Sequence, residues 1–201
     1  MITTETMTIM TTIMTTMMAN MACQNTNDTW SNFKDQIGHD GQRRDVFIEH
    51  YYAKYINPRL PPSWMTFEAL QFGLVSKTFY YLDTEDKREV AGLFGIKHPV
   101  FKSWAHSCSA LRNLCAHHGR VWNRVFGIKP TRPGNLKHLV PDNSRFYAHA
   151  VVIKVLLDKV APDSDWARRL KYLLDEHPEA AKNGMGFPDE WETTRVWVES
   201  L

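Results

Sequence analysis

The chain has 201 residues, of which 43% are hydrophobic and 23% charged. This length and composition exclude a wholly disordered or collagen-like chain and fit one domain of ordinary size, alone or with a tail. The formal net charge of +2 hides a local excess, because residues 90–141 contain no Asp or Glu and eight Lys or Arg. Such a segment indicates a site for a polyanion; a chance run of solvated positive side chains is the alternative.

Residues 1–24 form a low-complexity leader rich in Thr and Met. We expect this leader to be disordered and residues 25–201 to form the folded domain. The leader has neither the basic start of a signal peptide nor an apolar run long enough to span a membrane, so no membrane association is predicted. The three cysteines form no disulfide framework, which favours a reducing compartment. The predicted location is therefore the cytoplasm.

Hydrophobic residues recur at helical spacing along the body of the chain, and no hairpin or βαβ pattern is visible, which predicts an all-α fold. Thr84 is a candidate N-cap, as is Asn143 or Ser144. Three Pro and two Gly predict a loop over 127–141. The expected helices cover residues 28–37, 43–56, 64–82, 84–95, a stretch that begins at Pro99, 145–160, 164–176 and a small helical end at 184–201.

The helix that begins near Pro99 carries two stripes when residues are placed 100° apart. The apolar stripe contains Trp104, Cys108, Leu111, Cys115, His118 and Trp122. The polar stripe on the opposite side contains Asn113, His117, Arg120 and Arg124. Gly119 is expected to bend or end the helix between them. Within the apolar stripe His118 is more typical of a buried structural imidazole than of a functional one.

No cofactor is predicted, because the chain has no glycine-rich phosphate loop and no metalloprotease motif. Cys108 and Cys115 lie near several histidines, but their spacing is not that of a tetrahedral zinc site, so buried inert thiols are expected and no metal. The absence of carboxylates from the basic segment also argues against magnesium chemistry and two-carboxylate hydrolysis there.

Arg, Asn and His within residues 111–118 suit the cleavage of RNA by its own 2′-hydroxyl, a reaction that needs no metal. The His117 imidazole can carry protons at neutral pH, and the Arg112 guanidinium can hold two phosphate oxygens. Asn113 precedes His117 by one helical turn and can orient its ring. Arg112 lies about 140° from His117 on an ideal helix. A bend near Gly119 or a dimer can bring the two together, and we favour the dimer; a solvated Arg and a structurally satisfied His are the alternative.

Two segments resemble one known family. Residues 111–130 read LRNLCAHHGRVWNRVFGIKP, and residues 60–82 read LPPSWMTFEALQFGLVSKTFYYL. Both are similar, in order and spacing, to segments of the Abi-like family, the AbiD/AbiF-type abortive infection proteins of bacteria. The resemblance covers roughly residues 33–141 well and the C-terminal helices loosely.

This resemblance implies a HEPN-like helical bundle with additional C-terminal helices, often dimeric. Many members of the HEPN superfamily are metal-independent ribonucleases with an Arg-polar-His motif, which maps onto Arg112, Asn113 and His117 as catalytic residues. The implied function is an RNA endonuclease of an abortive-infection or toxin–antitoxin system of phage defence, acting by 2′-hydroxyl transesterification. The residues then expected to contact RNA are Arg120, Arg124, Lys129, Arg132 and His118.

The sequence leaves two alternatives open. The first is a non-catalytic module that binds or scaffolds RNA with the same basic face. The second is an inactive truncated remnant, because members of the family usually begin with a longer helical portion than this chain has. The expected partners are RNA, a second copy of the chain, and an antitoxin or a companion from a split gene.

Overall fold

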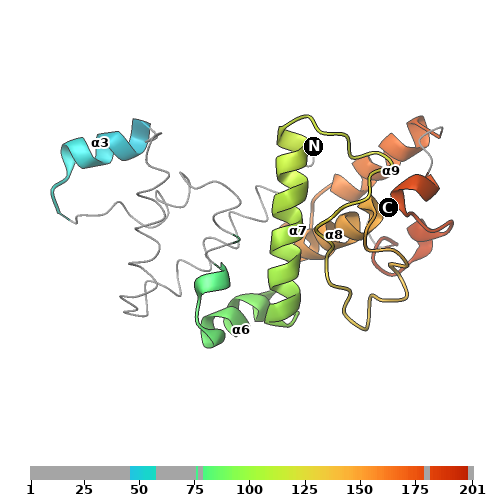
Figure 1. Ribbon diagram of the computed structural model, residues 1–201, viewed down its shortest axis with the longest axis horizontal. Helices are drawn as coiled ribbons and strands as arrows, with labels where there is room; N and C mark the ends of the chain where they lie inside the picture. The colour runs from blue at the N-terminus through green and yellow to red at the C-terminus, as the bar shows by residue number, and fades with distance from the viewer. Residues whose placement is uncertain (1–45, 58–75, 77–78, 179–181, 199–201) are drawn as a thin grey trace. The chain divides into compact units, whose positions relative to one another are not determined.

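The computed structural model describes residues 46–57, 76, 79–178 and 182–198 (Figure 1). Every regular element within these ranges is helical, which confirms the predicted all-α class. The described residues fall into two compact units, divided between Val90 and Ala91, and each unit is described by itself. None of the helices in the described ranges combines the length and the apolarity needed to cross a membrane. The predicted leader lies outside the described residues.

The N-terminal unit contains α3 (Val46–Lys54), which falls within the helix predicted over 43–56. Tyr51 is buried, and its ring centroid lies 5.1 Å from that of Tyr55. The helix predicted over 28–37 and most of that over 64–82 lie outside the described residues. At the described end of the helix predicted over 64–82, Phe79 and Leu82 are buried, as an apolar helix requires.

The next helix, α6 (Thr84–Leu93), begins at its predicted residue but has a different cap. The backbone N–H of Asp86 donates to Oδ1 of Asp83 at 2.9 Å. Asp83 therefore caps the helix, and the prediction of Thr84 was wrong by one residue because the residue before it offers a stronger acceptor. Gly95, with φ of 67°, ends the turn that follows α6, as expected for the residue type that adopts this backbone without strain.

The C-terminal unit is built on α7 (His98–Ala116) and α8 (Phe146–Val160), which pack against each other (Figure 1). Pro99 lies in the first turn of α7, as predicted. The fully buried side chains of the pair include Phe101, Trp104 and Leu111 from α7. Their spacing of three and seven residues places them on one side of the helix, which is why the sequence folds with this face toward α8.

The predicted cap of α8 was also wrong. Its N-cap is Arg145, which makes no side-chain capping hydrogen bond. The Ser144 hydroxyl instead donates to Asp142 Oδ1 at 2.6 Å, and hydrogen bonds from Ser144 lower the pKa of that carboxyl below its usual range. The amide of Asn143 donates to the Pro130 carbonyl at 3.0 Å. Both candidate caps are thus used to hold the preceding loop.

Aromatic side chains close the C-terminal unit. The helix α9 (Trp166–Glu176) is followed by the short 3₁₀ turns η1 (Lys182–Met185) and η2 (Trp191–Thr193). Trp166, Trp191 and Trp197 are fully buried, and the ring of Trp197 lies 6.0 Å from Trp166 and 5.0 Å from Trp191. This packing confirms the small helical end predicted over 184–201 for its described residues, with 3₁₀ turns instead of a longer helix.

Residues 127–141 form the predicted loop, and α7 holds it in place. The indole N–H of Trp104 donates to the Thr131 carbonyl at 2.8 Å, and the Thr131 N–H donates to Ser103 Oγ at 2.9 Å. The Arg132 guanidinium donates to the carbonyls of Val140 and Pro141 at 2.8 and 2.6 Å. These bonds give the loop a defined path without regular secondary structure.

A buried histidine makes the stability of this unit depend on pH. His149 on α8 is 1% exposed, its ring lies 4.3 Å from that of Phe126, and burial holds its pKa below the usual 6.5. The folded protein therefore keeps the imidazole neutral, whereas the unfolded chain gains a proton as the pH falls below about 6.5. The free energy of unfolding should therefore decrease as the pH falls below about 6.5, by up to about 1.4 kcal/mol per pH unit.

The measurement is urea unfolding at pH 7.5 and 5.5 for the wild type and His149→Phe. We expect a smaller fall of the midpoint between the two pH values in the variant, because the group that takes up the proton is gone. Equal falls in the two proteins would show that His149 does not cause the acid sensitivity.

Candidate functional site

The C-terminal end of α7 lies within the acid-free basic segment. The helix ends at Ala116, with His117 as its C-cap. The His118 N–H donates to the Cys115 carbonyl at 3.0 Å, and the Gly119 N–H donates to the Leu114 carbonyl at 2.8 Å. This pair of bonds is the Schellman motif, which turns the chain out of a helix through a residue with left-handed backbone.

His118 and Gly119 each have a distinct part in this turn. His118 adopts the left-handed conformation, with φ of 53°. A Cβ on Gly119 would stand 2.2 Å from Leu114 Cδ1 and 3.0 Å from the Leu114 carbonyl oxygen. A side chain at position 119 would require the Leu114 side chain to shift, so this close approach favours glycine. Together they make the chain leave the helix directly after His117, so that both imidazoles are exposed at its end.

Replacement of His118 by glycine should stabilise the protein. A non-glycine residue in the left-handed region is strained, so His118→Gly is expected to raise the free energy of unfolding by roughly 0.5–1 kcal/mol. His118→Val should lower it, because a β-branched residue tolerates this backbone least. Urea unfolding of the three proteins measures both changes. A less stable glycine variant would mean that the His118 side chain makes a contact worth more than the strain.

The two stripes predicted along this helix are partly wrong. Because α7 ends at Ala116, Arg120 and Arg124 do not continue the face of Asn113 and His117. His118 is exposed, and so is Trp122, at 43%. The apolar stripe is confirmed only within the helix, where Trp104, Cys108 and Leu111 are buried. A helical wheel extended past Gly119 placed residues by a periodicity that the chain no longer follows.

The two cysteines of this stripe differ in exposure. Burial raises the pKa of the Cys108 thiol to about 12, so this thiol is inert at neutral pH, as predicted. Cys115 is half-buried, and burial also raises its pKa. Within the described ranges, no three His, Cys, Asp or Glu side chains come together as a set of metal ligands.

A different polar face exists along α7. Lys102, His106, Asn113 and His117 are all exposed, and at 100° per residue they lie within about 60° of one another. The polar stripe predicted from the sequence ran from Asn113 toward the C-terminus and did not include Lys102 and His106. His106 follows Lys102 by four residues and Asn113 follows it by eleven. These helical spacings are the sequence signal that places Lys102 and His106 on the face of Asn113.

Arg112 and Asn113 are brought together at the end of this face. Arg112 is half-buried, and its Nη1 donates to Oδ1 of the exposed Asn113 at 3.2 Å. His117 is exposed, and its backbone N–H donates to the Asn113 carbonyl at 3.0 Å. Among the described residues, no side-chain hydrogen bond joins His117 to Arg112 or Asn113. Within one chain Asn113 therefore orients the guanidinium and not the imidazole.

The cations after the helix differ in availability. Arg120, Arg124 and Lys129 are exposed, and Arg124 Nη1 lies 3.5 Å from the Arg120 carbonyl oxygen. Arg132, in contrast, is engaged with two loop carbonyls and serves the fold. Arg145 holds the turn that carries Arg120 and Arg124, because it donates to Oδ1 of Asn123 at 3.3 Å. All three exposed cations belong to residues 90–141, which contain no Asp or Glu.

This surface can bind an anion and move a proton. A planar guanidinium oriented by an amide is suited to two phosphate oxygens, and an exposed imidazole can act as a proton donor or acceptor. The neighbouring cations add a positive field that attracts a polyanion. The arrangement thus supplies the chemical groups needed for the binding of a phosphodiester and for proton transfer to and from it.

Comparison with known proteins places the chain in a family. The sequence model of a family described as Abi-like protein matches residues 6–123, a range that includes all of α7 and starts within the Thr- and Met-rich leader. Searches among curated proteins and among solved structures gave no match. Since the matched range covers more than half of the 201 residues, the chain belongs to the Abi-like protein family, which indicates a role in abortive infection, a bacterial defence against phage.

Proposed function

We propose that this protein is a metal-independent RNA endonuclease of an abortive-infection or toxin–antitoxin system. The observation that carries the proposal is the exposed end of α7, where Arg112, Asn113 and His117 lie in a segment without carboxylates. Family membership supports the biological setting, and the charge supports RNA as the polyanion. The resemblance to HEPN ribonucleases supports the cleavage chemistry.

The proposed reaction is attack of a ribose 2′-oxygen on its own 3′-phosphate. A neutral His117 imidazole takes the 2′-hydroxyl proton, and a bond forms between the 2′-oxygen and phosphorus. The bond to the 5′-oxygen of the next nucleotide breaks, and that oxygen takes a proton from a protonated imidazole. Arg112 stabilises the additional negative charge on the phosphorane. The products are a 2′,3′-cyclic phosphate and a free 5′-hydroxyl.

The reaction needs a general base and a general acid, which in this scheme are one neutral and one protonated imidazole. In a homodimer with two α7 ends face to face, the second copy's His117 supplies the other proton, and Arg112 of one copy can lie near His117 of the other. The same arrangement doubles the positive field for RNA. Arg120, Arg124, Lys129 and His118 would bind the RNA backbone on either side of the cleaved bond.

One observation favours a second candidate, RNA binding without cleavage. Within the described residues of a single chain, the Arg112 and His117 side chains are not joined by a hydrogen bond. If no dimer forms, this surface can bind phosphate but lacks a converged pair of groups for catalysis. A companion from a split gene would then be needed for activity, or activity would be absent.

The experiment is digestion of a single-stranded RNA by the full chain in EDTA, with analysis of the product ends. We expect cleavage that persists in EDTA and yields 2′,3′-cyclic phosphates and 5′-hydroxyls. Cleavage that requires Mg²⁺ would contradict the mechanism. Intact RNA together with tight binding that weakens steeply with salt would favour the non-catalytic module.

A further inference from the structure

The chain that follows α7 exposes apolar side chains within the basic segment. Trp122, Val125 and Ile128 are 43%, 61% and 37% exposed. Of the five tryptophans in the described ranges, the other four are at most 1% exposed. An indole stabilises a folded chain when it is buried, and an exposed apolar cluster marks an interaction site. The exposure of Trp122 beside the candidate site therefore points to a ligand.

Trp122 lies in a turn of defined shape. The Arg124 N–H donates to the Val121 carbonyl at 3.3 Å, which closes a β-turn. Trp122 and Asn123 are its two central residues. Asn123 has a φ of 50°, and asparagine is one of the residue types that adopt this left-handed backbone. Among the described residues, Asn123 and His118 are the two non-glycine residues with positive φ, and both belong to the chain that leaves α7.

The start of α8 anchors this turn. Arg145 donates to Oδ1 of Asn123 at 3.3 Å and to the Gly184 carbonyl at 3.2 Å. The Phe126 N–H donates to the Ser144 carbonyl at 2.7 Å, and the Phe126 ring is buried. The turn is thus fixed on the C-terminal unit, and the exposed indole stands on a rigid support.

The neighbours of Trp122 match a nucleic acid strand. Arg120 and Arg124 are exposed, two residues before and two residues after it, and no carboxylate lies in residues 90–141. Such a strand offers phosphates to the cations and flat base faces to the ring. Trp122 follows His117 by five residues, so their Cα atoms are at most about 18 Å apart. One bound strand can therefore reach both side chains.

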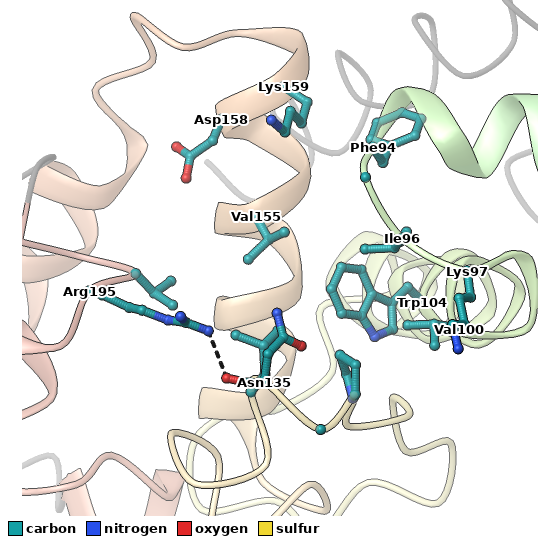
Figure 2. Close-up of a pocket in the computed structure, with 15 residues that line it drawn as sticks. Phe94, Ile96, Lys97, Val100, Trp104, Asn135, Val155, Asp158, Lys159 and Arg195 are labelled. Atoms are coloured by element: carbon teal, nitrogen blue, oxygen red, sulfur yellow. Dashed lines mark hydrogen bonds between the residues drawn. The ribbon is translucent and has the colours of Figure 1, made fainter.

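A cavity of about 730 Å³ in the same unit lacks this combination (Figure 2). Four segments contribute its walls, from within residues 94–104, 133–136, 155–159 and 195–196. Its cations Lys97, Lys159 and Arg195 lie on different sides of it. Lys159 lies roughly 21 Å along α8 from Arg145, the residue that holds the turn. Lys159 is therefore an exposed cation remote from Trp122.

We propose that Trp122 stacks on an unpaired base of the bound RNA while Arg120 and Arg124 bind the neighbouring phosphates. This inference rests on the proposed function, because it assigns a single strand as the substrate of that site. Bases within a duplex are stacked on one another and leave no free face for the indole. The site is then selective for RNA that is unpaired near the cleaved bond. Every base has a flat face, so stacking adds no sequence preference.

The test is titration of the full chain with a 2′-O-methyl RNA, which cannot be cleaved through its 2′-oxygen, as a single strand and as a duplex. Trp122→Ala should weaken binding of the single strand by about tenfold or more, the usual contribution of one stacked base. The affinity for the duplex should stay unchanged. Trp122→Phe keeps an aromatic ring, so its loss should be less than about threefold.

Three control variants accompany this test. Tyr172 is an exposed aromatic residue on α9, at 63%, outside the acid-free segment, so Tyr172→Ala should leave both affinities unchanged. Arg124→Gln should weaken binding of the single strand and of the duplex about equally, because it removes a phosphate contact. Lys159→Gln, remote from the turn, should change neither affinity.

The inference is overturned if Trp122→Ala binds the single strand like the wild type, or loses as much affinity for the duplex. It is also overturned if sedimentation shows that Trp122→Ala changes the oligomeric state, because the ring would then lie between protein chains. Cleavage of unmodified RNA in EDTA by the same proteins tests the proposed function separately. Binding that depends on Trp122 without cleavage would contradict the endonuclease and keep the stacking role. Cleavage and binding that are both insensitive to Trp122→Ala would do the reverse, and a wild type that binds no RNA would overturn both.

Discussion

His117→Gln is expected to lower the rate of RNA cleavage by about 10²–10⁴-fold, the usual contribution of a general acid or base. Glutamine keeps the backbone N–H that donates to the Asn113 carbonyl, so the end of α7 should be preserved. It removes only the imidazole, the group proposed to take up and give up a proton. The measurement is single-turnover cleavage of a labelled RNA in EDTA, with RNA affinity measured on the same proteins.

His138→Gln is the matched control for this prediction. His138 is also exposed and lies in the same acid-free segment, but it belongs to the loop over 127–141 and not to the end of α7. We expect its cleavage rate to remain within a factor of about two to three, and both variants to bind RNA as the wild type does. Equal rates for His117→Gln and the wild type would exclude His117 as the group that transfers the proton.

Of the substitutions for which a change in stability is predicted, Trp104→Ala should lower the free energy of unfolding most. Trp104 is 1% exposed, and its indole N–H holds the loop through the Thr131 carbonyl at 2.8 Å. Truncation removes this bond and leaves a large cavity next to α8, so the free energy of unfolding should fall by about 3–5 kcal/mol. Urea unfolding followed by circular dichroism measures the change.

Trp122→Ala separates the observed structure from the helical wheel. A helix extended through Gly119 would place Trp104 and Trp122 in the same buried stripe, and the two truncations would then cost similar amounts. In the structure Trp122 is 43% exposed and lies beyond the end of α7, so its truncation should change stability by less than about 0.5 kcal/mol. A loss of several kcal/mol at Trp122 would contradict the observed end of the helix.

The sequence predicted helix positions better than helix ends. Apolar periodicity located α6, α7, α8 and α9, because each helix must bury one face against the rest of its unit. The ends depend on single hydrogen bonds. Asp83 displaced Thr84 as a cap, and His118 took the left-handed position that glycine usually occupies. Such choices depend on local geometry that periodicity does not contain.

The part of the candidate site that depends on closeness along the chain could be predicted, and the part that depends on tertiary packing could not. Arg112, Asn113 and His117 lie within six residues, so their proximity follows from the chain itself, and the family resemblance falls on the same positions. Their catalytic roles stay a prediction. The role of Arg132 in holding the loop, and the cavity formed by four distant segments, depend on tertiary packing and could not be derived from spacing.

The central claim is that the end of α7 cleaves RNA through the substrate's own 2′-hydroxyl. The most direct measurement uses one RNA in two forms, with the nucleotide on the 5′ side of the main cleavage point carrying either a 2′-hydroxyl or a 2′-O-methyl group. The account predicts that the wild-type protein binds both forms but cleaves only the first at that bond, in EDTA. Cleavage of the 2′-O-methyl form at the same bond would contradict it.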